Sequence, residues 1–336
     1  MQYLKGDILT NEGFKGGYLS FERGEKAEIC KGLPPEKPIA EGLIVPTFIN
    51  AHTHLGDSFI REKNLTLPRN VRELVAPPNG LKHRLLKKAS EVELINGIKK
   101  SIKVMIERGT SHFFDFREDG FKGILQLKKA LERHRISSII LSRPLELKYE
   151  KNEMKLLLEN SDGIGLSSMS DWEYSEIEKI SKHTKKEGKI FALHASEVER
   201  EDIDLILDLH PDFLVHMMSA TESDLYNVKD EEIPIVICPR SSSFFNLKIN
   251  LELIRKTGVN ILLGTDNGML NSPDIIEEVK FLKKSYSVFS TEELLNMVTY
   301  TPRKALNLVD CINGPNLLGS FVVLDRDSLK PLYILK

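Results

Sequence analysis

Two histidines separated by one residue, His52 and His54, follow the apolar segment 43–51 of this 336-residue chain. Alternate residues of a β-strand point to the same side, so both imidazoles can face one site if this segment is extended. Neutral imidazoles are frequent ligands of zinc and iron, and the pair could therefore begin a metal site. Taken alone, such a pair is better explained as two surface histidines in a loop.

Three further polar residues occupy corresponding places along the chain. His194 follows the apolar run 190–193, His216 follows the run 213–215, and Asp266 follows the run 261–265. Each of them could separately be a buried, hydrogen-bonded histidine or an aspartate that caps a helix. Because all of them stand where a short apolar run ends, we predict that they gather with the first pair at one edge of a sheet.

The elements that must position these residues are short apolar runs alternating with amphipathic segments. Parallel strands buried on both faces have this appearance, and eight such runs occur, at 43–48, 112–116, 138–141, 163–166, 190–193, 213–215, 233–237 and 261–263. Ser90 and Glu93 form a capping box before one amphipathic segment, in which Val92 and Ile95 begin an apolar stripe. The pattern predicts an α/β fold, a (β/α)8 TIM barrel, whose sites form at the C-terminal ends of the strands.

A doubly wound open sheet is the alternative fold, and it would require a reversal of strand order. No Gly-x-Gly-x-x-Gly turn or phosphate loop follows any of the runs, which disfavours a nucleotide-binding version of that fold. Both ends of the chain instead alternate polar and apolar residues, as in 18–22, 27–29, 319–325 and 332–335. We therefore expect a small β-sandwich formed from both termini, 1–46 with 318–336, beside a barrel domain over 47–317.

Composition excludes several classes of function. The formal net charge of −2 gives no reason to expect nucleic acid as a partner. No segment is long and apolar enough to cross a membrane, and the first residues lack the apolar core of a signal peptide. Three widely spaced cysteines, Cys30, Cys238 and Cys311, argue against a disulfide framework. We expect a cytoplasmic protein that acts on a small molecule.

The ordered set of strand-end residues resembles the amidohydrolase superfamily over nearly the whole chain. Segment 42–54 is similar to the first-strand signature of that superfamily. Segments 194–197 (His-Ala-Ser-Glu), 238–241 (Cys-Pro-Arg-Ser) and 264–266 (Gly-Thr-Asp) are similar to its branch with cytosine, guanine and S-adenosylhomocysteine deaminases and triazine hydrolases. Binuclear members carry a carboxylated lysine at the end of the fourth strand, whereas residues 165–168 here contain none, so one metal is expected.

The resemblance implies a role for each of these residues. One divalent metal, Zn most readily and Fe as the alternative, would be held by His52, His54, His194 and Asp266. Asp266 would also accept a proton from the attacking water, His216 would orient the hydroxide, and Glu197 would protonate a ring nitrogen of the substrate. For Glu197 the alternative is a carboxylate that stabilises the start of a helix.

The activity implied is that of an aminohydrolase, a deaminase that replaces the exocyclic amino group of a pyrimidine, purine or pterin and releases ammonia. A cyclic amidase or a chlorohydrolase on the same scaffold is the alternative, and an inactive relative kept for binding is a third. A homo-oligomer is compatible with the resemblance. Candidate substrate contacts, each of which could instead be ordinary surface charge, are Asp57, Arg61, Lys82, His83, Arg117, Glu118, Arg143, Trp172 and Arg240. The basic members would suit an anionic group on the substrate.

Overall fold

The computed structural model describes residues 1–22, 25–308 and 317–335, which divide between two compact units. The first unit is built from residues 1–49, 105–111 and 274–336, and the second from residues 50–104 and 112–273. Cys311 lies outside the described residues, while Cys30 and Cys238 are both free thiols. The domain boundaries inferred from the sequence remain a prediction.

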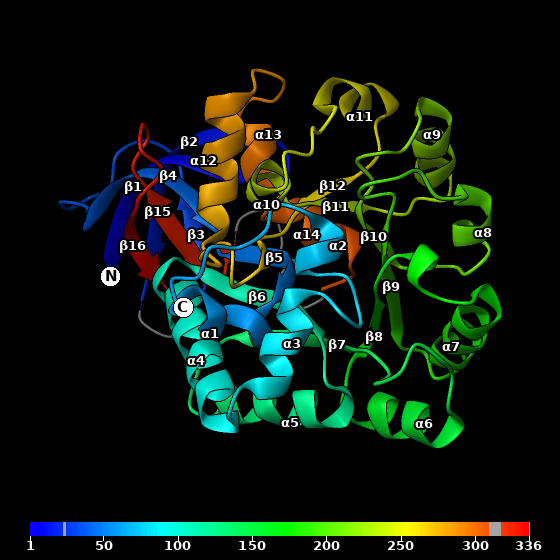
Figure 1. The fold of residues 1–336 in the computed structure, drawn as a ribbon. Helices are drawn as coiled ribbons and strands as arrows, with labels where there is room; N and C mark the ends of the chain where they lie inside the picture. The colour runs from blue at the N-terminus through cyan, green and yellow to red at the C-terminus, as the bar shows by residue number, and fades with distance from the viewer. Residues whose placement is uncertain (23–24, 309–316, 336) are drawn as a thin grey trace. The chain divides into compact units, whose positions relative to one another are not determined.

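The first unit contains one seven-stranded sheet with the order β14-β3-β2-β1-β4-β15-β16 (Figure 1). Both ends of the chain contribute to it, because β4 pairs in parallel with β1 on one side and antiparallel with β15 on the other. These pairings join the described strands into a single ladder, so the two facing sheets of the predicted sandwich are not confirmed. The strands are β1 (Gln2–Thr10), β2 (Gly13–Phe21), β3 (Ala27–Cys30), β4 (Ala40–Pro46), β14 (Leu317–Leu318), β15 (Phe321–Leu324) and β16 (Pro331–Leu335).

The apolar run 43–48 is divided between two strands, and its prediction as one strand is wrong. β4 ends at Pro46, and β5 (Phe48–His54) begins after Thr47. Thr47 leaves the ladder at this point: its N–H donates to the carbonyl of Ser320, and its own carbonyl accepts from the guanidinium of Arg303. Apolar character continues through both strands, so hydrophobicity gives no sign of the break.

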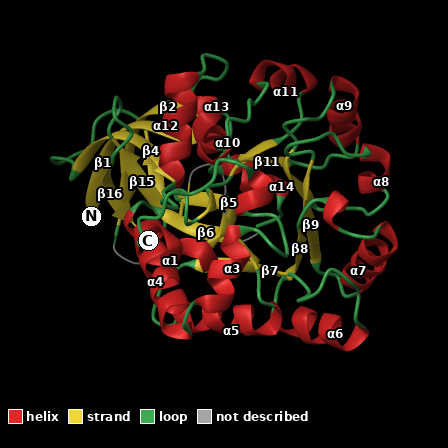
Figure 2. Cartoon of the chain, in the orientation of Figure 1, coloured by secondary structure: helices red, strands yellow, loops and turns green. Residues whose placement is uncertain are grey.

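The second sheet contains nine strands in the order β12-β11-β10-β9-β8-β7-β6-β5-β13 (Figure 2). The order follows the chain from β5 to β12 without a reversal, so the doubly wound alternative is wrong. Only Gly264 and Thr265 separate the two edge strands along the chain, and the parallel sheet therefore curls. Its further strands are β6 (Thr110–Arg117), β7 (Ser137–Ser142), β8 (Gly163–Leu166), β9 (Ile190–Ala195), β10 (Phe213–His216), β11 (Ile235–Ile237), β12 (Ile261–Leu263) and β13 (Asp266–Asn267).

Helices alternate with the strands, as the sequence pattern predicts. The Ser90–Glu93 capping box begins helix α4 (Glu91–Glu107). The prediction that Val92 belongs to its buried stripe is wrong, because Val92 is 68% exposed and Leu94 is buried instead. No helix in the described ranges is long and apolar enough to cross a membrane. The others are η1 (Leu55–Asp57), α1 (Ser58–Arg61), α2 (Val71–Leu74), α3 (Leu81–Lys88), α5 (Gly120–Leu131), α6 (Lys151–Asn160), η2 (Met169–Asp171), α7 (Tyr174–Lys186), α8 (Ile203–Leu207), α9 (Glu222–Asp230), α10 (Pro239–Phe244), α11 (Leu251–Thr257), α12 (Ile275–Ser285), α13 (Thr291–Asn296) and α14 (Tyr300–Ala305).

Candidate metal centre

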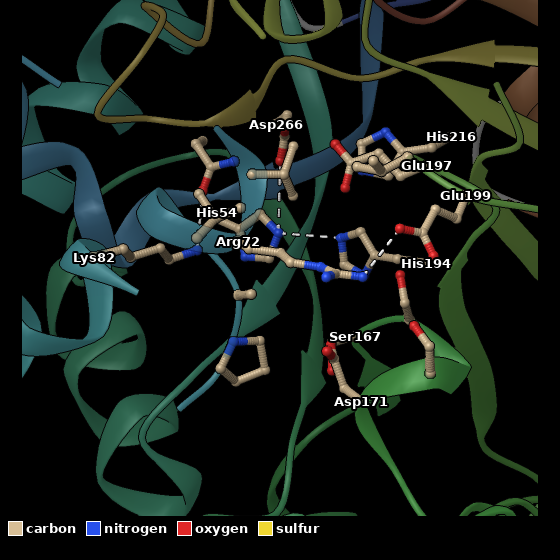
Figure 3. A pocket seen from close by; sticks show the side chains of 18 of the residues that line it. His54, Arg72, Lys82, Ser167, Asp171, His194, Glu197, Glu199, His216 and Asp266 are labelled. Carbon is tan, nitrogen blue, oxygen red and sulfur yellow. Dashed lines mark hydrogen bonds and ion pairs between the residues drawn. The ribbon is translucent and has the colours of Figure 1, made fainter. Parts of the chain in front are cut away.

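Five side chains come together at the C-terminal ends of β5, β9 and β10 and just after β12, and Figure 3 shows four of them, His54, His194, His216 and Asp266. His52 and His54 lie at the C-terminal end of β5, and His194 lies near the end of β9. His216 is the last residue of β10, and Asp266 is the first residue of β13. His216 and Asp266 take left-handed backbone angles, with φ of 80° and 58°. Such angles are uncommon outside glycine and concentrate at functional sites.

The ring nitrogens and the carboxylate converge on a small volume. His194 Nε2 lies 3.2 Å from His52 Nε2 and 3.4 Å from His54 Nε2. Asp266 Oδ1 lies 3.3 Å from His52 Nε2 and 3.6 Å from His54 Nε2. His52, His194 and His216 form a second possible set of metal ligands, since their potential ligand atoms lie within 4.8 Å of one another. This set shares His52 and His194 with the residues above.

Hydrogen bonds to the outer ring nitrogens fix how two of these imidazoles face the centre. His194 Nδ1 donates to the carbonyl of Leu166 at 2.7 Å, and His54 Nδ1 donates to the carbonyl of Phe116 and to Glu118 Oε1 at 3.1 and 2.9 Å. A carbonyl oxygen can only accept, so Nδ1 carries the proton in both rings. Burial, followed by the charge of Lys82, lowers the pKa of His54 to about 4, so the ring is neutral.

A neutral ring protonated at Nδ1 presents a lone pair at Nε2. The lone pairs of His54 and His194 therefore face each other across 3.4 Å, an arrangement that repels unless a cation lies between them. Three imidazole nitrogens and one carboxylate are a donor set that suits zinc or another divalent transition metal. The residues present thus fit a metal ion.

Glu197 follows β9 and reaches toward the same centre. Its side chain is 12% exposed, and its Oε1 lies 3.6 Å from His216 Nε2. Burial, reinforced by the negative charges of Asp266 and Asp171, raises the pKa of Glu197 to about 8. Without a bound metal, the carboxyl group therefore keeps its proton at neutral pH. The alternative of a helix-start carboxylate does not apply, because the next helix, α8, begins at Ile203 with Asp202 as its cap.

A cavity opens from the metal centre, beside Glu197 and the ligand candidates. Four of the candidate substrate contacts line its wall, namely Lys82, His83, Glu118 and Arg143. Polar residues that follow β8 also line the cavity, and they were not predicted as contacts although they stand at a strand end like the ligand candidates. They are Ser167, Ser168, Ser170 and Asp171.

The remaining candidate contacts lie outside this wall, and most of them have partners within the protein. Arg61 donates to the carbonyls of Gly268 and Asn271, Arg240 donates to that of Ser272, and the indole of Trp172 donates to Ser167. Asp57 and Arg117 are buried, where Asp57 accepts from the N–H of Met269 and Arg117 lies 3.5 Å from Asp115. The local sequence around a basic residue does not show which carbonyls will bind it.

Comparisons with known proteins agree with this architecture. The model of the amidohydrolase family matches residues 43–312. The chain is 37% identical over 333 residues to an uncharacterised protein of Methanocaldococcus jannaschii, covering 91% of this chain and 85% of that one. It is 26% identical over 353 residues to a 5-methylthioadenosine/S-adenosylhomocysteine deaminase of Caldicellulosiruptor saccharolyticus, covering 91% and 77%. The 5-methylcytosine deaminase of Klebsiella pneumoniae superposes with a TM-score of 0.76 at 13% identity, covering 100% and 96%.

Proposed function

Because the chain belongs to the amidohydrolase family and is a hydrolase of carbon–nitrogen bonds, we propose that it is a metal-dependent aminohydrolase. In this proposal it replaces an exocyclic amino group of a nitrogen heterocycle, of pyrimidine, purine or pterin type, with hydroxyl and releases ammonia. The observation that carries the proposal is the largely buried carboxyl of Glu197, whose Oε1 lies 3.6 Å from His216 Nε2 beside the metal centre. Deamination of such a ring needs an acid at this place, because the ring nitrogen must be protonated before water adds to the neighbouring carbon.

The side chains divide the reaction between them. His52, His54, His194 and Asp266 would hold one divalent metal, with zinc favoured by the donor set. When bound, that metal lowers the pKa of water toward neutrality and supplies a nucleophile. Glu197 gives its proton to the ring nitrogen, and Asp266 accepts the proton that the attacking water releases and passes it to the amino group, which departs as ammonia. The remaining proton of the new hydroxyl group restores Glu197. His216, 3.6 Å from Glu197, orients the attacking oxygen.

The activities of two of these similar proteins support this assignment. One is a deaminase of 5-methylthioadenosine and S-adenosylhomocysteine, and the other is a deaminase of 5-methylcytosine. Both names describe loss of ammonia from an aminated ring, one a purine and the other a pyrimidine. The pair supports the reaction type and leaves the choice of ring to experiment.

The test combines metal analysis with a screen for ammonia release from aminated pyrimidines, purines and pterins. E197Q should retain its metal and lose activity by about 10²- to 10⁴-fold, the usual contribution of a general acid. Glu199→Gln is the matched control, because Glu199 lies on the same loop with its side chain 74% exposed. Full activity in E197Q would refute the acid role. Turnover of cyclic amides or chlorinated rings without any ammonia release from amines would assign the site to an amidase or chlorohydrolase instead, and no turnover at all would favour a binding protein.

A further inference from the structure

Lys82 is a buried cation at an unfavourable place in the chain. It is 2% exposed and is the second residue of α3 (Leu81–Lys88), two residues after the N-cap Gly80. The N-terminal end of a helix carries partial positive charge, which repels an ammonium group. Burial by itself lowers the pKa of Lys82, yet the carboxylates of Glu118 and Asp57 outweigh this effect and raise it, so the side chain remains charged. Its place must therefore depend on its acceptors.

Three acceptors surround the ammonium group of Lys82. Its Nζ lies 2.5 Å from Glu118 Oε1, 3.0 Å from Asn267 Oδ1 and 3.5 Å from Asp57 Oδ2. Glu118 and Asn267 each accept a hydrogen bond from this ammonium group, whereas Asp57 makes only an ion-pair contact with it. Lys82 lines the cavity, but its two hydrogen bonds are made within the protein, unlike those of the substrate contact that was predicted.

Each acceptor stands next to a candidate metal ligand. Glu118 Oε1, the atom closest to the ammonium, also accepts from Nδ1 of His54 at 2.9 Å. Asn267 follows Asp266 and is the register partner of His54 where β13 pairs with β5. Asp57 comes three residues after His54, in η1. Lys82 therefore contacts one residue that follows β6, one that follows β5 and the last residue of β13. Figure 3 shows Lys82 and His54 in the wall of the cavity.

We propose that Lys82 is a positioning residue of the metal site, whose ammonium holds the Glu118 carboxylate in the place where it orients the His54 ring toward the metal. The proposal rests on the metal-binding part of the proposed function and is independent of the substrate. A carboxylate that accepts from the outer nitrogen of a ligand histidine fixes the ring and its tautomer. In this chain the carboxylate is itself fixed by a buried cation, so the geometry of His54 is controlled from outside the strand that carries it.

The test measures zinc affinity directly, by competition with a chelating dye on the full-length protein stripped of metal. Lys82→Met should weaken zinc binding by about 10- to 100-fold, the usual effect of losing a partner of a ligand histidine. Lys82→Arg, which keeps the charge, should recover part of that loss. Lys100→Met is the matched control, because Lys100 forms an ion pair with Glu62 on an exposed helix face, and it should bind zinc as the parent does.

A double variant shows whether Lys82 acts through Glu118. Glu118→Gln alone should weaken zinc binding, and K82M in that background should weaken it no further, because the link is already broken. The double variant removes both charges of the buried pair and should fold even if K82M alone does not. Zinc binding by folded K82M within twofold of the parent would overturn the proposal, as would an equal additional loss in the E118Q background.

Failure of this proposal is distinguishable from failure of the proposed function. If the parent protein binds no divalent metal, the metal site itself is wrong and both proposals fall. If the parent binds zinc and K82M binds it equally well, only the role of Lys82 is refuted. A variant that keeps its zinc affinity but shows a higher KM would instead make Lys82 a substrate contact.

Discussion

The raised pKa of Glu197 predicts that this residue makes the metal-free protein less stable as the pH rises. A glutamate in the unfolded chain ionises near pH 4.5, whereas Glu197 in the folded protein remains protonated to about 8. Below pH 4.5 the residue is protonated in both states and has no effect on stability. Between these values the unfolded state releases its proton first, so the free energy of unfolding falls, and above about 8 it levels off.

The size of this effect follows from the shift. A difference of about 3.5 pKa units at 1.36 kcal/mol each gives roughly 5 kcal/mol at most. E197Q has no such titration, because an amide stays neutral. The difference in unfolding free energy between E197Q and the parent should therefore grow between pH 4.5 and 8 in favour of the variant, and then remain constant.

Urea unfolding in the presence of a chelator, at several pH values from 4.5 to 9, measures this difference. Removing the metal is necessary because a divalent cation near Glu197 would favour the ionised carboxylate. Glu199→Gln serves as control, since Glu199 is 74% exposed and its replacement should give a difference that changes little with pH. A difference that is constant with pH for E197Q would show that Glu197 ionises normally, and would remove the basis for its role as an acid.

Two further changes test the positioning of the site. Gly264→Ala would place a Cβ atom 2.6 Å from Cβ of His52, so we expect a loss of about 1–3 kcal/mol in the free energy of unfolding, measured in urea. Gly16→Ala should lose less, because its Cβ would meet only Asp7 Oδ1, at 3.9 Å. Equal stability of the two alanine variants would contradict this. The carboxylate of Glu201 accepts hydrogen bonds from the backbone N–H groups of Ser170 and Ser196, on two cavity loops, at 2.7 and 2.8 Å. Glu201→Ala should therefore lower kcat while the metal content stays unchanged. A kcat equal to that of E199Q would contradict this prediction.

The positions of the ligand candidates could be inferred from the sequence because one simple rule governs them. Side chains that follow apolar runs of a parallel sheet meet at one edge, and the structure brings His52, His194, His216 and Asp266 together in this way. Their roles at the metal remain predictions. The curled parallel sheet and its alternating helices follow from the same periodicity.

Features that depend on contacts between distant segments could not be inferred. Lys82 enters the site from α3, so the rule about strand ends does not apply to it, and its pairing with Glu118 joins segments 36 residues apart. The division of the run 43–48 depends on partners of Thr47 that come near the C-terminus. Val92 fits a buried stripe in the periodic pattern, yet the neighbouring Leu94 fills that place.

The pairing of β4 with β15 has a consequence for the synthesis of the chain. β4 is made early, but its partner, which includes Phe321 opposite Pro46, is translated more than two hundred residues later. During elongation, one edge of β4 has no strand to bind it, and apolar edges of this kind attract other chains. The first unit can complete its sheet only after β15 and β16 have left the ribosome. A cell that makes this protein must therefore shield the nascent N-terminal strands until then, and chains that stall before β15 should be the ones that aggregate.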